Sequence, residues 1–194
     1  MDQPANPDFK QRERVAAQVS AAFKAQGYQL VQYGGATVEQ YSRGGYATGD
    51  VDLGFIDVAP PLEVRAQVMA SLGCERGTRL YLLNGVVVDL GGRAELLSSR
   101  LVEISTPDGM LLLEAPEESL VQRVLMSVYP QEDGDQKNAA LILMTQALAG
   151  HLPLDWNEVD RLAALPGFKV QSVVAAYKME AEKLISTING SIQS

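Results

Sequence analysis

The segment from Asp50 to Ile56 constrains the fold more than any other. It alternates acidic and apolar residues through Asp50-Val51-Asp52-Leu53 and then becomes wholly apolar. Alternation with a period of two is typical of a strand, because successive side chains point to opposite faces of a sheet. The change of pattern predicts a strand that is exposed at its first end and buried at its second.

Strand-like and helical patterns alternate through the first 115 residues. Asn84-Gly85 between two apolar runs predicts a tight hairpin turn, and Pro107-Asp108-Gly109 predicts a second hairpin. Asn6 and Pro7 are candidates for the cap and first turn of the opening helix. The predicted helices span 7–27, 36–41 and 61–72, and the predicted strands span 28–33, 50–56, 78–83, 86–90, 101–106 and 110–115.

From Pro116 onward the apolar residues recur only at helical spacing. Asp155 and Glu158 have the spacing of a reciprocal helix cap. The predicted helices begin at Pro116 and Asp155 and span about 135–150 and 168–188. This change of pattern predicts an α/β domain over residues 1–115 and a helical domain over residues 116–194.

Composition excludes several classes of function. The chain has 194 residues and a net charge of −8, which argues against broad attraction to nucleic-acid backbones or anionic lipid. A single cysteine, Cys74, and a single histidine, His151, exclude an intrachain disulfide and the usual Cys/His zinc cluster. The polar start and the absence of a run of about 20 apolar residues predict a cytoplasmic protein with no membrane partner.

Two carboxylates form a candidate metal site. Asp50 and Asp52 are two residues apart on one predicted strand, so they share a face and lie about 6–7 Å apart along the chain. Mg²⁺ is usually held by one or two carboxylates together with phosphate oxygens of a substrate. The alternative is a solvated strand start with no ligand.

Gly34-Gly35, at a predicted strand-to-helix turn, would let the backbone approach a phosphate chain, with helix amides donating to its oxygens. The alternative is an ordinary turn. Asp89 lies within Val86–Leu90, and ionised acids avoid apolar strands unless they are paired or metal-bound. If this strand lies beside that of Asp50 and Asp52, Asp89 completes a two-metal site as ligand, base or both.

Other side chains near these motifs have two interpretations each. Arg43 and Arg79 are candidate phosphate ligands, because guanidinium binds phosphate in a bidentate manner, or they are solvated surface residues. Tyr33, Tyr41 and Tyr46 surround the glycine turns and either stack on a nucleotide base or pack at strand ends.

The chain resembles the DNA polymerase beta-type nucleotidyltransferase superfamily over about residues 30–90. The resemblance rests on Tyr33-Gly34-Gly35-Ala36, on Asp50-Val51-Asp52-Leu53 and on Asp89. The Gly-Gly-Ala form, together with a helical tail containing Pro116–Leu120 and Leu154-Asp155-Trp156, is more particularly similar to the bacterial AbiEii toxin group and its uncharacterised relatives.

The resemblance implies an α+β fold, in which a mixed sheet with flanking helices is followed by an all-helical C-terminal part. It implies Asp50 and Asp52 as shared metal ligands, Asp89 as third ligand or base, and probable two-metal Mg²⁺ chemistry. Gly35 stands where the superfamily often has Ser, so Thr37 and Ser42 are candidate replacements for the lost hydroxyl. Lys137 lies where toxin-group relatives carry a basic residue that reaches the triphosphate, although a solvated lysine at a helix start fits equally well.

The implied reaction transfers a nucleoside monophosphate from an NTP to a hydroxyl acceptor. Candidate acceptors are an RNA 3′ end such as that of tRNA, a protein side chain and a small molecule. The toxin-group resemblance also implies a toxin-antitoxin setting with a cognate partner. The alternative function is that of a catalytically inactive protein which keeps the fold and acts as a binding or regulatory partner.

Overall fold

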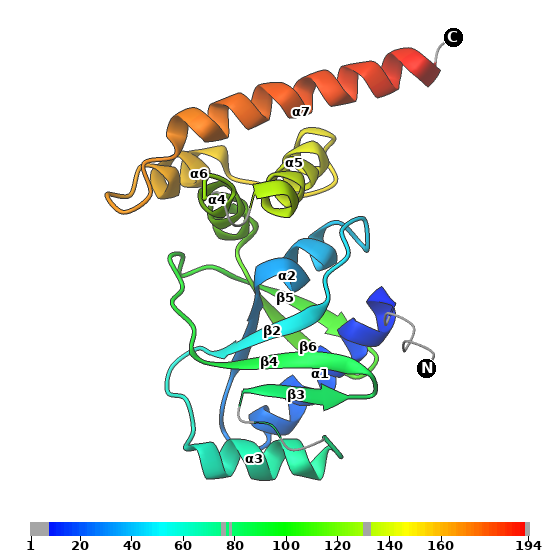
Figure 1. Cartoon of the computed structure of the whole chain (residues 1–194), viewed down its shortest axis with the longest axis vertical. Coiled ribbons are helices and arrows are strands. Elements are labelled where there is room, and N and C mark those ends of the chain that lie inside the picture. Colours follow the sequence, from blue (N-terminus) through cyan, green and yellow to red (C-terminus); the bar gives the residue numbers. More distant parts are fainter. Residues whose placement is uncertain (1–7, 75–76, 78, 130–132, 193–194) are drawn as a thin grey trace. The chain divides into compact units, whose positions relative to one another are not determined.

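The computed structural model describes residues 8–74, 77, 79–129 and 133–192. The chain divides into two compact units, Met1–Glu114 and Ala115–Ser194. The division falls one residue before the boundary that the sequence pattern predicts. The first unit contains all the strands of the described chain, and the second is built from helices (Figure 1).

A six-stranded mixed sheet forms the first unit, in the order β3-β4-β2-β1-β6-β5. Strand β2 is central; it runs parallel to β4 and antiparallel to β1, while β1 runs parallel to β6. The hairpins β3–β4 and β5–β6 form the two edges. The strands are β1 (Leu30–Tyr33), β2 (Asp50–Phe55), β3 (Leu80–Leu83), β4 (Val86–Arg93), β5 (Leu101–Thr106) and β6 (Gly109–Glu114). The predicted fold class is confirmed.

Helices α1 (Phe9–Lys24) and α3 (Leu62–Ser71) share one hydrophobic core with the sheet. The ring of Phe23 in α1 meets that of Phe55 in β2 edge to face, with 5.2 Å between centroids. The Asp8 carboxylate caps α1 by accepting from the amide of Gln11 at 2.8 Å. The helix therefore begins at Phe9, and the predicted cap at Asn6 lies outside the described residues.

Most predicted elements of this unit are present, with shifted ends. Helix α2 (Gly34–Tyr41) begins directly after β1, two residues earlier than predicted. Strand β4 continues past the predicted end at Leu90 to Arg93, where it still pairs with β2. Strand β3 begins at Leu80, and Thr78, the predicted first residue of that strand, lies outside the described residues.

The second unit consists of α4 (Pro116–Ser127), α5 (Asp133–Leu148), α6 (Trp156–Ala163) and α7 (Gln171–Ile192). Helix α4 packs against α5 and α6, and α5 packs against α7. Asp155 caps α6 as predicted, accepting from the amide of Asn157 at 2.9 Å. The Asp155 amide, which the predicted reciprocal cap pairs with Glu158, donates instead to Glu117 Oε1 of α4 at 2.7 Å. None of the helices within the described ranges has the length and apolar character to cross a membrane.

A buried ion pair joins α1 to α2. Arg12 Nε donates to Glu39 Oε2 at 2.7 Å, and the two side chains are only 5% and 3% exposed. Burying a charged side chain away from water costs free energy. In an ion pair, the attraction between the two charges offsets that cost only while both side chains are present. The pair therefore fixes α2, and with it the turn at Gly34, against the opening helix.

We predict that Arg12→Met strongly destabilises the protein, because it leaves the Glu39 carboxylate buried without its guanidinium. The expected loss is about 3–5 kcal/mol in the free energy of unfolding, measured by urea unfolding followed by circular dichroism. Adding Glu39→Leu should restore most of the loss.

The matched control is Arg14→Met. Arg14 also lies on α1, and its partner is Asp108, but the arginine side chain is 63% exposed. Exposed pairs contribute about 1 kcal/mol or less. Equal losses for the two arginine variants would contradict the account of the buried pair.

Candidate functional site

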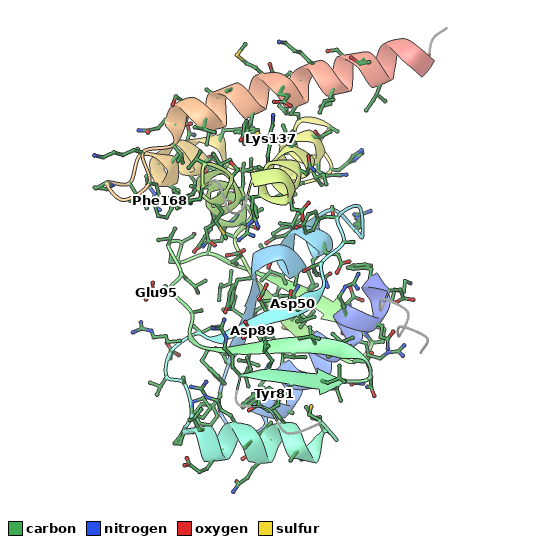
Figure 2. The ribbon with its side chains drawn as sticks, in the orientation of Figure 1. Asp50, Tyr81, Asp89, Glu95, Lys137 and Phe168 are labelled. Carbon is green, nitrogen blue, oxygen red and sulfur yellow. The ribbon has the colours of Figure 1, made fainter. Side chains whose placement is uncertain are left out.

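Three of the predicted side chains lie in a row across the sheet. Tyr33 of β1 pairs with Asp52 of β2, and Asp52 pairs with Asp89 of β4. Residues directly opposite each other on paired strands share a face. Asp50 lies two residues before Asp52 and so shares that face as well. The strands of Asp50 and Asp89 lie side by side (Figure 2), which is the arrangement that the predicted two-metal site requires.

The Gly34 turn lies directly against the Asp52 carboxylate. A Cβ built on Gly34 would be 2.3 Å from Asp52 Oδ2, and the backbone there has a φ of +72°. Both observations require glycine at this position. The Gly34 amide donates to Glu114 Oε1 at 3.1 Å, and Glu114 is buried. The amide of Gly34, a predicted nucleotide-binding residue, is therefore engaged within the protein.

A hydroxyl that the sequence analysis did not single out lies beside Gly35 and Asp50. Thr48 Oγ1 donates to Asp50 Oδ1 at 3.3 Å, and a Cβ built on Gly35 would be 3.0 Å from the same Thr48 oxygen. Thr37 and Ser42 are the predicted replacements for the missing serine. Thr37 is fully buried, and the Ser42 hydroxyl donates to the Glu39 carbonyl at 3.2 Å. Thr48 is therefore a further candidate for that hydroxyl.

Asp89 is held by Arg79. Arg79 Nε donates to Asp89 Oδ1 at 2.5 Å and Nη2 donates to Oδ2 at 2.6 Å, which is a bidentate ion pair. The Asp89 side chain is 12% exposed, whereas that of Arg79 is 67% exposed. The pair explains how an ionised acid is accommodated in the apolar run of β4.

The three predicted acids differ in how well their oxygens suit a divalent cation. Asp50 and Asp52 supply oxygen ligands on one face, which suits Mg²⁺ completed by phosphate oxygens. Asp89 is different, because both of its oxygens accept from Arg79. Among the residues described, no three Asp, Glu, His or Cys side chains are grouped to hold a metal ion. The three-carboxylate, two-metal site therefore stays a prediction, while the pair on β2 fits a cation.

Tyr33 lies in a slot made by two glycines. A Cβ on Gly54 would be 3.0 Å from Tyr33 Cε1, and a Cβ on Gly91 would be 2.8 Å from Tyr33 Oη. Burial raises the pKa of the Tyr33 hydroxyl, and the charges of Asp52 and Asp89 raise it further. The Tyr33 hydroxyl is therefore harder to ionise than that of a free tyrosine.

The sequence carries a signal for this slot that the sequence analysis missed. The tripeptide Asp-Leu-Gly occurs at 52–54 and again at 89–91, on the two neighbouring parallel strands. In each copy the acid and the glycine are two residues apart, so they lie on the same face of the sheet. The repetition predicts a pair of carboxylates beside a strip without side chains, which Tyr33 covers.

Lys137 lies in the second unit. Its ammonium is 2.9 Å from Glu180 Oε2 and 5.2 Å from the centre of the Tyr177 ring. The hydrogen bond to Glu180 raises the pKa of Lys137. These contacts join α5 to α7 within the helical unit, and contact with a triphosphate stays a prediction.

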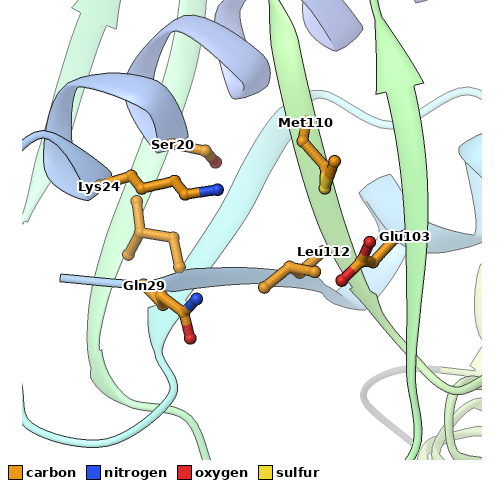
Figure 3. Close-up of a pocket in the computed structure, with 7 residues that line it drawn as sticks. Ser20, Lys24, Gln29, Glu103, Met110 and Leu112 are labelled. Atoms are coloured by element: carbon orange, nitrogen blue, oxygen red, sulfur yellow. The ribbon is translucent and has the colours of Figure 1, made fainter. Parts of the chain in front are cut away.

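Two cavities in the first unit are lined by other residues. One has a volume of about 50 Å³ and contains Lys24 and Glu103 among its lining side chains (Figure 3). The other has a volume of about 390 Å³ and includes Lys24, Tyr28 and Asp57. Neither contains a predicted site residue.

Comparisons with solved structures show a nucleotidyltransferase-like fold. An antigenic nucleotidyltransferase-like protein from Paracoccidioides brasiliensis is similar, with a TM-score of 0.55, 14% identity, and coverage of 85% of this chain and 93% of that one. The antibiotic-resistance factor ANT(2'')-Ia, in solution, has a TM-score of 0.52, 14% identity, and coverage of 95% and 100%. No protein-family model and no curated protein matches the chain.

We predict that Gly91→Ala destabilises the protein by about 1–3 kcal/mol, because the added methyl group overlaps the Tyr33 hydroxyl. Gly92→Ala is the matched control on the same strand, since a Cβ there would meet nothing within 4 Å. In a Tyr33→Phe background, which lacks the hydroxyl, Gly91→Ala should cost clearly less. Thermal unfolding of the four variants measures this, and an equal cost in both backgrounds would show that the tyrosine does not fill the slot.

Proposed function

We propose that this protein transfers a nucleoside monophosphate from an NTP to a hydroxyl acceptor with the help of Mg²⁺. The observation that carries the proposal is the contact of the Asp52 carboxylate with the Gly34 turn, on a fold of the nucleotidyltransferase type. That contact brings the candidate cation ligands next to the backbone segment suited to a phosphate chain.

Asp50 and Asp52 would hold the cation, and a bound Mg²⁺ would supply charge neutralisation at the phosphates and acidification of the acceptor hydroxyl. Thr48 orients Asp50 through its hydrogen bond to Oδ1. Gly35 has no side chain, and this lets the Thr48 hydroxyl lie directly beside the turn. Glu114 holds the preceding amide, and so fixes the turn before any ligand arrives.

Net charge supports a cation-mediated mode of nucleotide binding. The chain carries 24 acidic against 16 basic residues, so it does not attract a triphosphate through an excess of lysine and arginine. The same acidity disfavours a long contact with RNA as acceptor. A protein side chain or a small molecule with a hydroxyl group fits the charge better. The toxin-antitoxin setting rests on sequence resemblance alone and stays a prediction.

A second function is favoured by one observation, the bidentate pair of Arg79 with Asp89. A protein in which that pair is permanent would lack the third carboxylate and would bind partners without turnover. In such a protein, neutralising Asp50 or Asp52 should raise the melting temperature by relieving the repulsion between neighbouring carboxylates.

We predict that Asp52→Asn abolishes NTP-dependent labelling of an acceptor, with a loss of at least about 100-fold, because a cation ligand is removed. Incorporation of label from each of the four α-labelled NTPs into cell-extract RNA, protein and small-molecule fractions measures the activity and identifies the acceptor class. Asp57→Asn, at an exposed position of the same unit, is the control and should retain activity.

A thermal-shift series accompanies this experiment. The wild-type melting temperature should rise only when NTP and Mg²⁺ are present together, because only the complete ligand binds the folded state tightly. Asp52→Asn should lose that rise. If no NTP stabilises the wild type and Asp52→Asn is itself more stable, the binding function replaces the transferase function.

A further inference from the structure

In the Arg79–Asp89 pair, the backbone of Arg79 is fixed by a hydrogen bond, whereas its side chain is exposed. The Arg79 carbonyl accepts from the amide of Leu90 at 3.0 Å, which ties the segment before β3 to β4. The Arg79 side chain is 67% exposed, and its guanidinium reaches back to both oxygens of the largely buried Asp89. The side chain can therefore change partners while the backbone stays in place.

The position of this guanidinium is set by the charges around it. Asp52 and Asp89 lie opposite each other on neighbouring strands, and like charges in that relation repel. Arg79 places a positive charge directly on Asp89. A divalent cation on the same face would supply the same compensation, so Arg79 and a cation compete for Asp89.

A guanidinium binds carboxylate and phosphate in the same bidentate geometry. An arginine released from Asp89 beside a bound triphosphate has a second partner of matching shape and charge. The arginine side of the pair is accessible to water, so a phosphate group can approach the guanidinium from the solvent.

We propose that Arg79 exchanges partners: it pairs with Asp89 in the nucleotide-free protein and binds phosphate oxygens when a metal–nucleotide complex is present. The exchange frees Asp89 to face the cation held by Asp50 and Asp52. The nucleotide half of this proposal rests on the proposed function. The metal half rests on the Arg79–Asp89 contact and is tested separately.

Calorimetric titration with Mn²⁺ alone tests the competition. Arg79→Ala should bind Mn²⁺ at least about five-fold more tightly than the wild type, because Asp89 is released. The double variant Arg79→Ala/Asp89→Asn should bind no more tightly than Asp89→Asn. Arg79→Lys keeps the charge and loses the bidentate geometry. Its affinity for Mn²⁺ should lie between those of the wild type and Arg79→Ala.

Arg161→Ala is the matched control. Arg161 forms the same kind of bidentate pair, with Glu158, at 2.6 Å and 2.7 Å, on α6. Its removal should leave Mn²⁺ affinity unchanged. Circular dichroism establishes that each variant is folded. An unchanged or weaker Mn²⁺ affinity in folded Arg79→Ala would overturn the competition.

Titration with a non-hydrolysable NTP in the presence of Mg²⁺ tests the exchange. Arg79→Ala should bind the nucleotide at least about five-fold more weakly, in spite of its stronger metal site. Equal or tighter nucleotide binding by Arg79→Ala would overturn the exchange while leaving the proposed function standing. If the wild type binds no nucleotide with Mg²⁺, the proposed function fails together with the exchange, and the Mn²⁺ titration alone decides the competition.

Discussion

Repulsion between two carboxylates on neighbouring strands governs the arrangement of the candidate site. Asp52 and Asp89 are in register on β2 and β4, and they share the face of the sheet that lies opposite the α1 and α3 core. Neighbouring carboxylates are stabilised by a positive charge nearby. In this structure Arg79 supplies that charge, and the Tyr33 hydroxyl lies over Gly91, two residues after Asp89.

The candidate site also depends on the close approach of side chains to the backbone at three glycines. Gly34 allows the Asp52 carboxylate to reach the turn after β1, and Gly54 and Gly91 let the Tyr33 ring lie across two strands. A methyl group at any of the three positions would overlap one of these side chains. The geometry of the site therefore depends on these three glycines as well as on the acids and the tyrosine.

The sequence predicts the elements well, because their hydrophobic periods are clear and local. It predicts neither the order of the six strands nor the parallel pairing of β2 with β4, since both depend on contacts between distant segments. From the sequence alone, Asp89 lies near Asp52 only on the condition that their two strands pair. The repeated Asp-Leu-Gly was present in the sequence and would have supported that condition.

Side-chain partners were the least predictable part of the site. Arg79 was considered for phosphate contact, and its pairing with Asp89 depends on the geometry of the β3–β4 hairpin. Thr37 and Thr48 have the same hydroxyl, and only the folded chain shows that the first is buried and the second lies at Asp50. Lys137 has its partners, Glu180 and Tyr177, on a helix 40 residues away in sequence, so no local pattern reveals them.

A difference map from crystals soaked with Mg²⁺ and a non-hydrolysable NTP tests the central claim most directly. The account predicts density for a cation coordinated by Asp50 and Asp52, with the phosphates passing over the Gly35 turn. Nucleotide density at a site remote from these acids, or a site that stays empty at saturating ligand, would contradict it.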